Sequence, residues 1–332
     1  MQEIELNFQN ILVIDFGQLG DVVLSLPALC ALRERFTDSK ITLMVGRSAE
    51  EIARLANAAD EYIVVDRVEL RDSNKLWSLA QVFKLVRNVR RRKFDLVIDL
   101  NSLYETNLLG FFSGAKARLF ENRERRSINL LSNLKPPREH KQKHHTDRYL
   151  SVLEPLGIVG ARRTVTVAPR PDELKAVDLY LDSLGVSDKR LIGLFLGAGH
   201  TTRRWGIENF SRLAEELSKN DACRVLVLLG PEERELRAGL QEKFANTAAV
   251  VEEMSLGRFY ALLSRLEVLV TGDTGPMHLG AIAGAGIVLL SEVNTTQVYR
   301  PLITDLKVIE DRPFKDITPD QVVVAARELL GR

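Results

Sequence analysis

The sequence predicts an α/β protein built from two doubly wound domains. Short apolar runs alternate with segments of helical spacing along nearly the whole chain, which is typical of parallel sheets covered on both faces. The alternation is interrupted once, in a polar stretch at 121–148, and then restarts. The length of 332 residues also exceeds that of one ordinary hydrophobic core. We therefore expect two domains, at 1–168 and 169–332.

The first half alternates strands and helices in a regular order. Each expected strand is a short apolar run, and the segment after it has its apolar residues at helical spacing. A basic run at 87–93 ends one of these helices, where cations complement the helix dipole. We expect strands at 11–14, 41–45, 62–65 and 95–99, and helices at 21–36, 49–57, 75–91 and 103–112.

Residues 121–148 form a polar and basic stretch that we interpret as a long surface loop. Loops of this length are usually functional or mobile. Two interpretations remain open, namely an acceptor-side surface that meets phosphates or acidic sugars, and an ordinary solvated loop. His140, His144 and His145 lie here, but no cysteine or suitably spaced carboxylate completes a metal site, so we predict no metal.

The second half repeats the alternation of the first. A helix at 146–157 and a short strand at 165–167 lead into it. The last helix follows Thr318-Pro319, a capping residue and a first-turn proline. We expect strands at 191–196, 224–229, 248–251, 267–271, 287–290 and 306–309, and helices at 172–184, 207–219, 232–243, 257–265, 280–284 and 319–330.

Composition narrows the functional classes. The net charge of +1 creates no global field that would recruit nucleic acid, so we expect no nucleic-acid partner. Cys30 and Cys223 lie far apart in apolar segments, as core thiols of a reducing compartment do. No apolar run approaches the ~20 residues of a membrane span, and the acidic N-terminus does not resemble a signal peptide. We expect a cytoplasmic protein.

Three polar motifs follow expected strands. Gly20-Asp21 follows the first strand and opens a helix. Residues 197–205 read Gly-Ala-Gly-His-Thr-Thr-Arg-Arg-Trp, and residues 273–278 read Asp-Thr-Gly-Pro-Met-His. Doubly wound sheets bind ligands at the carboxyl ends of their strands, and helix N-termini bind phosphates. We therefore expect all three motifs to line one cleft.

In this order and spacing, the three motifs resemble those of glycosyltransferase family 9, the ADP-heptose:lipopolysaccharide heptosyltransferases. That family has G-D-V near its start, G-A-S/T…K-R-W in mid-chain and D-T-G-x-x-H near its end. The resemblance spans the whole chain. It implies the GT-B architecture, two Rossmann-like domains facing across a cleft, in which the last helix often packs back on the first domain.

The resemblance also implies an activity. It points to an inverting, metal-independent glycosyltransferase that needs no cofactor and moves a heptose, or a related sugar, from a nucleotide-sugar donor. The implied donor is ADP-heptose, and the implied acceptor is of the lipopolysaccharide-core type. Peripheral contact with the cytoplasmic face of the inner membrane is compatible with this role. The chain has no D-x-D pair of the kind that metal-dependent GT-A enzymes use.

On the acceptor side, Asp21 matches the family's catalytic base, and the preceding glycines, Gly17 and Gly20, allow close approach to it. A carboxylate within hydrogen-bond reach of a hydroxyl can take its proton, although a plain helix cap is the alternative.

The middle motif supplies the residues expected at the leaving diphosphate. Arg203 stands where the family usually has lysine. A cation there stabilises the leaving diphosphate, and Thr201 and Thr202 can donate hydroxyls to the same phosphates.

On the donor side, the resemblance assigns residues of the last motif and one methionine. Asp273 matches a residue that contacts the donor sugar, whereas Thr274, Gly275 and His278 match positions beside the diphosphate. Met254 matches a position beside the adenine. Core packing is the alternative for Met254, and a purely structural histidine is the alternative for His278.

Three alternative functions are compared with glycosyl transfer. An NAD(P) oxidoreductase requires G-x-G-x-x-G after its first strand, and Gly17-x-x-Gly20 does not supply it. A different nucleotide-sugar transferase or epimerase on the same fold would keep the phosphate loops and change the sugar contacts. A non-catalytic nucleotide-sugar-binding protein would not need Asp21. Residues 288–301 lack the Gly-Pro turn of the family's F-G-P-T-x-P, which leaves the sugar open.

Overall fold

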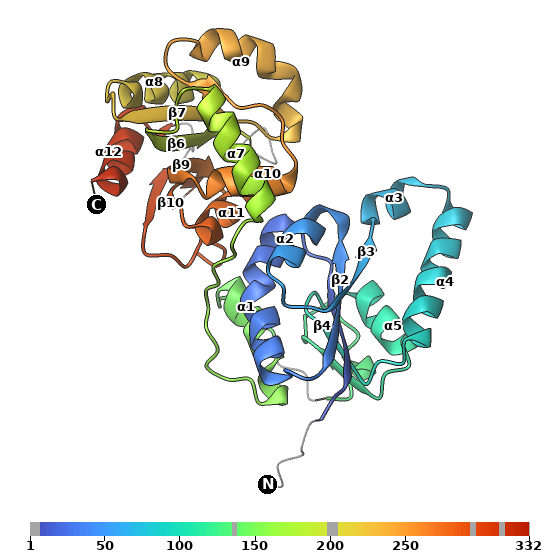
Figure 1. The fold of residues 1–332 in the computed structure, drawn as a ribbon. Coiled ribbons are helices and arrows are strands. Elements are labelled where there is room, and N and C mark those ends of the chain that lie inside the picture. The colour runs from blue at the N-terminus through green and yellow to red at the C-terminus, as the bar shows by residue number, and fades with distance from the viewer. Residues whose placement is uncertain (1–6, 135–137, 198–204, 293–296, 312–315, 332) are drawn as a thin grey trace. The chain divides into compact units, whose positions relative to one another are not determined.

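The protein is described by a computed structural model in which the chain forms two compact units, Met1–Val165 and Thr166–Arg332. Each unit has a central parallel sheet with helices on both faces (Figure 1). The predicted α/β class with two doubly wound sheets is confirmed. The structure describes residues 7–134, 138–197, 205–292, 297–311 and 316–331.

A five-stranded sheet forms the centre of the first unit. Its order is β3-β2-β1-β4-β5, so β1 lies in the middle and the chain winds outward from it in both directions. All pairings are parallel, and they bring the carboxyl ends of the strands to one edge. The strands are β1 (Asn10–Asp15), β2 (Lys40–Gly46), β3 (Glu61–Val65), β4 (Leu96–Asp99) and β5 (Ala117–Phe120).

Helices cover both faces of this sheet. Figure 1 shows α1 and α2 on one side and α3, α4 and α5 on the other. Leu12 and Ile14 of β1 face the second group, because they share a core with Val89 of α4 and Leu109 of α5. α6 packs beside α1. The helices are α1 (Leu19–Arg35), α2 (Glu50–Leu55), α3 (Arg67–Asp72), α4 (Lys75–Arg91), α5 (Tyr104–Phe112) and α6 (His145–Val152), with 3-10 turns at Arg47–Ala49, Asn129–Leu131 and Glu154–Leu156.

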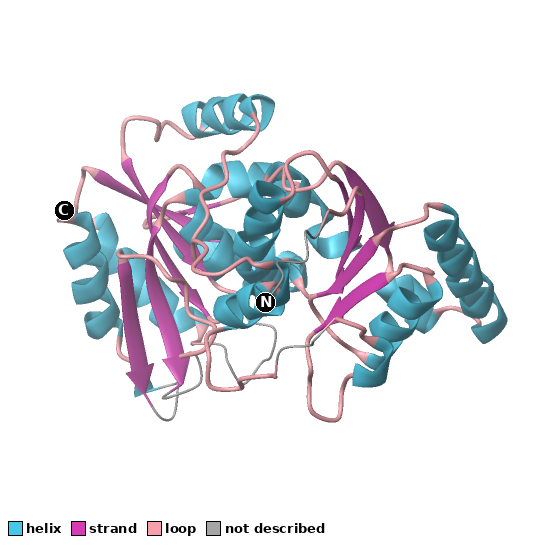
Figure 2. Cartoon of the chain, turned by 90° about the horizontal axis from the view of Figure 1, so that it is seen from below, coloured by secondary structure: helices cyan, strands magenta, loops and turns pink. Residues whose placement is uncertain are grey.

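The second unit contains a six-stranded parallel sheet of order β11-β10-β9-β6-β7-β8. β6 and β9 are neighbours in its middle, so the loops that follow these two strands leave the sheet next to each other. In Figure 2 the strands of each unit appear in magenta with cyan helices beside them. The strands are β6 (Arg190–Phe195), β7 (Cys223–Leu228), β8 (Ala249–Val250), β9 (Leu266–Gly272), β10 (Gly286–Glu292) and β11 (Leu306–Asp311).

The helices of the second unit fall into two groups. α8, α9 and α12 share one core with the sheet, whereas α10 packs against α7 and α11. The terminal helix α12, for which the family resemblance suggests packing on the first domain, lies here against α8 and the strands of its own unit. The helices are α7 (Pro171–Ser183), α8 (Ile207–Ser218), α9 (Arg237–Phe244), α10 (Leu256–Leu263), α11 (Gly275–Ala283) and α12 (Pro319–Leu330), with a 3-10 turn at Pro231–Leu236.

Three expectations about elements need correction. Residues 165–167 form no strand; the carbonyl of Val167 instead accepts a hydrogen bond of 2.6 Å from the Tyr260 hydroxyl. The expected helix at 232–243 is a 3-10 turn followed by α9, and α11 begins at Gly275 rather than near residue 280. The short strand β5 and the short helix α3 were not predicted. Within the described ranges, no helix is both long enough and apolar enough to cross a membrane.

Gly280 and Gly239 give a matched test of how tightly α11 packs. A Cβ on Gly280 would lie 2.7 Å from Leu269 Cδ2 and 3.2 Å from Ile287 Cδ1, so Gly280→Ala must shift the buried Leu269 side chain or move α11 away from its sheet. We expect it to lower the free energy of unfolding by about 1–3 kcal/mol. Gly239 of α9 has nothing within 4 Å of such a Cβ. Gly239→Ala should therefore raise that free energy by up to about 1 kcal/mol, and chemical denaturation that finds equal effects would contradict this packing.

Candidate active site

The loop between β1 and α1 carries Asp21 at the carboxyl end of the central strand. Three successive backbone N–H groups of this loop each donate to a side chain. Phe16 N donates to Asn101 Oδ1, Gly17 N to Asp15 Oδ1 at 3.0 Å, and Gln18 N to Asp21 Oδ2 at 3.0 Å. The last contact is the return half of a helix cap, since Asp21 is the third residue of α1. The loop and the half-buried Asp21 carboxylate therefore hold each other in place.

Gly17 lets Asp21 approach the loop this closely. A Cβ at Gly17 would lie 2.5 Å from Asp21 Cβ and 3.1 Å from Asp15 Oδ1, so no larger residue fits without moving one of them. The sequence predicted a close approach at the glycines that precede Asp21, and the structure places Gly20 beside Asp21 in the first turn of α1. The prediction is confirmed at Gly17, where the steric requirement is shown.

Asp15 is fully buried beneath the loop. Its Oδ2 accepts a hydrogen bond from Ser25 Oγ, and its Oδ1 accepts the one from Gly17 N. Burial, with a smaller contribution from the negative charge of Asp21, raises the pKa of Asp15 to about 6, although the hydrogen bonds from Ser25 and Gly17 lower it. Burial also raises the pKa of Tyr149 on α6, with contributions from Asp15 and Asp21. Asp15 was not predicted as a site residue, although a carboxylate that ends a buried strand is visible in the sequence.

A second buried carboxylate, Asp99, ends the neighbouring strand β4. Its Oδ1 accepts from Asn101 N at 3.1 Å and Ser102 N at 2.8 Å, and its Oδ2 accepts from Asn107 Nδ2 at 2.7 Å. Burial raises the pKa of Asp99 to about 6, against these hydrogen bonds. Asp99 thus shapes the turn that presents Asn101 to the β1–α1 loop.

The segment after β5 adds a buried ionic cluster. Arg148 of α6 forms ion pairs with Glu121 and Glu139, and Arg123 lies 3.5 Å from Glu139. Arg123 Nη1 also donates to the backbone carbonyl of Asn101 at 2.7 Å, so the cluster connects to the β1–α1 loop. Burial raises the pKa of Glu121 to about 7, although Arg148 and Arg123 lower it.

These contacts correct one interpretation of residues 121–148. The segment is not merely a solvated loop, because Glu121, His144, His145 and Arg148 are buried. His145 Nε2 lies 2.9 Å from Arg148 Nη1, and His144 Nδ1 accepts from Thr146 N at 3.2 Å. In the described part of the chain, no group of three or more histidine, cysteine or acidic residues is arranged to hold a metal ion.

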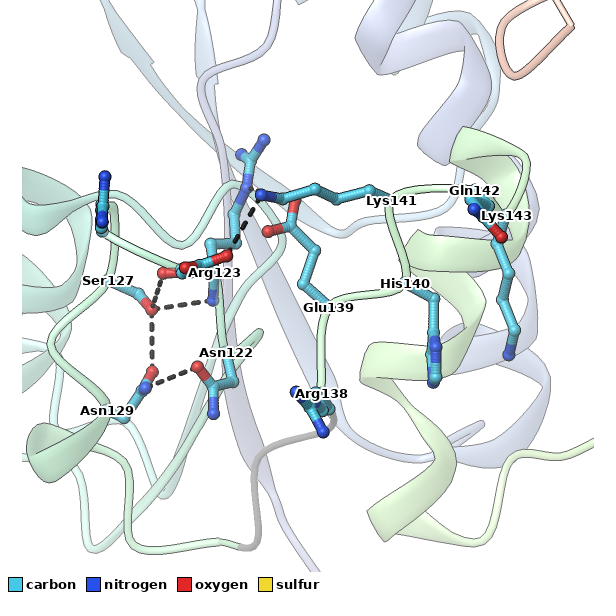
Figure 3. A pocket seen from close by; sticks show the side chains of 12 residues that line it. Asn122, Arg123, Ser127, Asn129, Arg138, Glu139, His140, Lys141, Gln142 and Lys143 are labelled. Carbon is cyan, nitrogen blue, oxygen red and sulfur yellow. Dashed lines mark hydrogen bonds and ion pairs between the residues drawn. The ribbon is translucent and has the colours of Figure 1, made fainter.

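The same segment forms an open pocket of about 950 Å³ (Figure 3). Its walls come from residues 122–129 and 138–143, and hydrogen bonds through Ser127 and Asn129 brace one side. Five cations and two carboxylates line it. The charged lining consists of Arg123, Arg125, Arg138, Lys141 and Lys143 with Glu124 and Glu139.

In the second unit, the turn between β9 and α11 carries the last motif. Asp273 and Thr274 are half-buried between the strand and the helix, and Thr274 is the residue that precedes the first turn of α11. Thr274 Oγ1 lies 3.2 Å from Thr271 Oγ1. Gly275 begins the helix, and the buried His278 lies in its first turn. The structure thus gathers four sequence-predicted residues at one helix N-terminus.

The loop after the adjacent strand β6 is described only at its ends. Thr201, Thr202 and Arg203 lie outside the described residues. Trp205, where the chain resumes, is buried, donates from Nε1 to the Ile317 carbonyl at 2.8 Å and contacts the Phe210 ring.

Met254 lies elsewhere on the same edge of the sheet. It is half-buried between β8 and α10. In the sheet order, β6 and β7 separate β8 from β9. The side chain is therefore set apart from the β9–α11 turn and is partly open to solvent.

Comparison with known proteins identifies the family of the chain. The family model described as glycosyltransferase family 9 (heptosyltransferase) matches residues 82–309, more than two thirds of the chain. The chain belongs to glycosyltransferase family 9. It is therefore a glycosyltransferase of the heptosyltransferase family, as its motifs predicted.

Individual family 9 proteins are distant in sequence. Lipopolysaccharide heptosyltransferase 3 of Escherichia coli K12 is 22% identical over 340 residues, covering 94% of this chain and 95% of its own. A family 9 glycosyltransferase structure from Veillonella parvula has a TM-score of 0.85 at 24% identity, covering 98% of both chains. The E. coli heptosyltransferase WaaC with ADP-2-deoxy-2-fluoro heptose has a TM-score of 0.76 at 19% identity, covering 96% of this chain and 99% of that one. These likenesses confirm the GT-B fold.

Asp15→Asn tests the buried carboxylate under the loop. Because the folded-state pKa of about 6 lies above the usual 3.8, ionisation of Asp15 weakens the folded state as pH rises from about 4 through 6. Asparagine can accept from Gly17 N and donate to Ser25 Oγ without that charge. The free energy of unfolding of the variant, relative to wild type, should therefore increase between pH 4 and 7 by on the order of 3 kcal/mol.

The control for this measurement is Asp38→Asn, at an exposed carboxylate. The free energy of unfolding of this variant relative to wild type, measured with urea, should not change with pH. Parallel pH curves for Asp15→Asn and wild type would show that Asp15 is not a strained buried acid.

Proposed function

We propose that this chain transfers a heptose, or a closely related sugar, from an ADP-linked donor to an acceptor of the lipopolysaccharide-core type. Family membership supports the sugar class, and the WaaC structure with ADP-2-deoxy-2-fluoro heptose supports an ADP-linked donor. The observation that carries the proposal is the placement of Asp21. It is a half-buried carboxylate at the carboxyl end of the central strand, in the motif position of the family's base.

In the proposed reaction, Asp21 takes the proton from the attacking hydroxyl of the acceptor. The hydroxyl oxygen forms a bond to the anomeric carbon from the face opposite the diphosphate. The bond from that carbon to the phosphate oxygen breaks, and ADP leaves with the electron pair, so the configuration inverts. Asp21 suits this role because Oδ2 is held by Gln18 N while Oδ1 accepts no hydrogen bond from the described residues.

The second unit supplies the proposed donor site. The first N–H groups of a helix lack intrahelical partners and attract phosphate, and the nine-residue helix α11 offers them at Thr274 and Gly275. We assign His278 to the same diphosphate side and Asp273 to the hydroxyls of the sugar.

Three further residues complete the proposed phosphate contacts, and one completes the nucleotide contacts. Arg203, Thr201 and Thr202, outside the described residues, would add a cation and two hydroxyls at the diphosphate. Met254 would pack against the adenine, which its partial exposure permits. No D-x-D pair is present for a metal-bridged diphosphate, which supports metal-independent transfer.

We assign the pocket at 122–143 to the acceptor. Arg125, Arg138 and Lys143 form no ion pair with any carboxylate of the described residues, so their charges are available to anionic groups of a core saccharide. Arg123 lines the pocket and also holds Asn101. An acceptor bound there would lie against the same hydrogen-bonded structure that positions Asp21.

We place the reaction in the cytoplasm. Cys30 and Cys223 are both free thiols, one in each unit, which agrees with a reducing compartment. The named lipopolysaccharide heptosyltransferase among its relatives supports the same assignment.

A different donor sugar is the second candidate. One observation favours it: the family's Gly-Pro turn is absent after β10. Residues 294–301 read Asn-Thr-Thr-Gln-Val-Tyr-Arg-Pro. Calorimetric titration with ADP, UDP, GDP and dTDP separates the candidates. Selective binding of ADP supports an ADP-heptose type of donor, whereas selectivity for another nucleotide supports the alternative.

Asp21→Asn tests the proposed base. Asparagine can still accept from Gln18 N but cannot take a proton, so kcat should fall by about 10²–10⁴-fold. ADP affinity, measured by calorimetry, should stay at the wild-type value because Asp21 is not a nucleotide contact. Wild-type turnover by Asp21→Asn would remove this residue from the mechanism, and absent ADP binding by the wild type would contradict the donor assignment.

A further inference from the structure

Helix α4 exposes an unusual amount of apolar surface. Leu76 is 78% exposed, Leu79 69% and Phe83 67%. Their spacing of three and four residues places them on one face of the helix. Isolated exposed apolar residues are normal on protein surfaces, but a contiguous row of large ones marks an interaction site.

This row is not the side by which α4 packs on its sheet. Val89 is the buried residue of the helix, and Leu85 and Val86 pack partly against the same core. The apolar face of α4 is thus wider than the sheet requires. Val68 of the adjacent helix α3 is 60% exposed, and Trp77 is also partly exposed.

The charge of α4 has one sign. The helix carries five cations and no aspartate or glutamate, although the whole chain has nearly equal numbers of each sign. No carboxylate in the described part of the chain forms an ion pair with any of the five. They are Lys75, Lys84, Arg87, Arg90 and Arg91.

The helix dipole explains only part of this charge. Cations at the C-terminal turn are favourable, which accounts for Arg90 and Arg91. Lys75 lies at the N-terminal end and Lys84 in the middle, where the dipole offers no such stabilisation. Arg87 and Arg90 follow Phe83 by four and seven residues, so cations continue the apolar row along the helix.

We propose that the exposed face of α4, formed by Leu76, Leu79 and Phe83 with its flanking cations, binds the surface of an anionic lipid bilayer. A helix with an apolar row and basic flanks lies in the headgroup region with its apolar side chains inserted. Lysine and arginine add attraction to anionic lipids, and tryptophan is favoured at this depth. The single sign of the charge selects an anionic surface over a protein surface of mixed charge.

The assignment does not depend on the proposed reaction, since none of these residues belongs to the candidate active site. The proposed lipid contact requires only that this face of α4 stays exposed. The helix packs on its sheet through Val89, which leaves the face exposed. Substitutions on this face should leave the fold and ADP binding unchanged.

Vesicle sedimentation tests the apolar row. Wild-type protein should sediment with phosphatidylcholine–phosphatidylglycerol vesicles and much less with pure phosphatidylcholine vesicles. Leu79→Ser with Phe83→Ser should weaken binding at least about tenfold. The matched control is Leu179→Ser on α7, where the leucine is 61% exposed, and it should bind as wild type does.

A charge series tests the cations independently. Lys84→Gln with Arg87→Gln should weaken binding to the anionic vesicles by about fivefold for each charge removed, and added salt should weaken wild-type binding in the same way. Lys175→Gln with Arg212→Gln removes the same charge from the second unit and should have no effect.

Two results would overturn the proposal. One is vesicle binding that is absent in the wild type or unchanged in both α4 variants. The other is a dimer in sedimentation equilibrium that Leu79→Ser with Phe83→Ser dissociates, since the face would then bind a second copy of the chain.

Discussion

Three hydrogen bonds from successive N–H groups of the β1–α1 loop determine the geometry of the candidate active site. Asn101, Asp15 and Asp21 each accept one of them. Such a loop at the end of a buried strand cannot leave its N–H groups unpaired without a cost of about 1–3 kcal/mol each. The side chains that satisfy the backbone are therefore also the ones that orient the proposed base.

The same requirement explains why carboxylates are buried around this loop. Asp15 and Asp99 end the central strand β1 and its neighbour β4, and their hydrogen bonds to backbone N–H groups offset part of the cost of burial. Their raised pKa values show that the offset is incomplete. The buried carboxylates thus lower the stability of the fold at the edge where parallel sheets bind ligands, as is common at functional sites. Arg123 extends this structure to the basic pocket through Asn101.

The sequence predicted most of the fold and only part of this site. Apolar runs and helical spacing located most of the larger elements, because those patterns depend on local periodicity. Asp21 could be selected from its motif. The contact between Phe16 and Asn101 could not, because it joins residues 85 positions apart through the adjacency of β1 and β4. Strand order depends on how the whole sheet assembles, and no local pattern reports it.

Other misses have equally physical causes. Strand β5 is only four residues long and contains the charged residue Arg118, so it lacks the apolar run of the other strands. The Arg118 side chain donates hydrogen bonds to the carbonyls of Leu131 and Ala115. Without that strand, the burial of Glu121 just after it could not be recognised. The polar sequence of 121–148 indicated exposure, but its charges neutralise one another in pairs around Arg148.

We infer that the packed loop, and not merely the presence of a carboxylate, makes Asp21 competent as a base. The most direct measurement is kcat for sugar transfer by Gly17→Ala, in which Asp21 is retained but its Cβ must move from the position 2.5 Å from the new methyl group. We expect kcat to fall about a hundredfold, with ADP affinity at the wild-type value. A folded variant that turns over at the wild-type rate would contradict it.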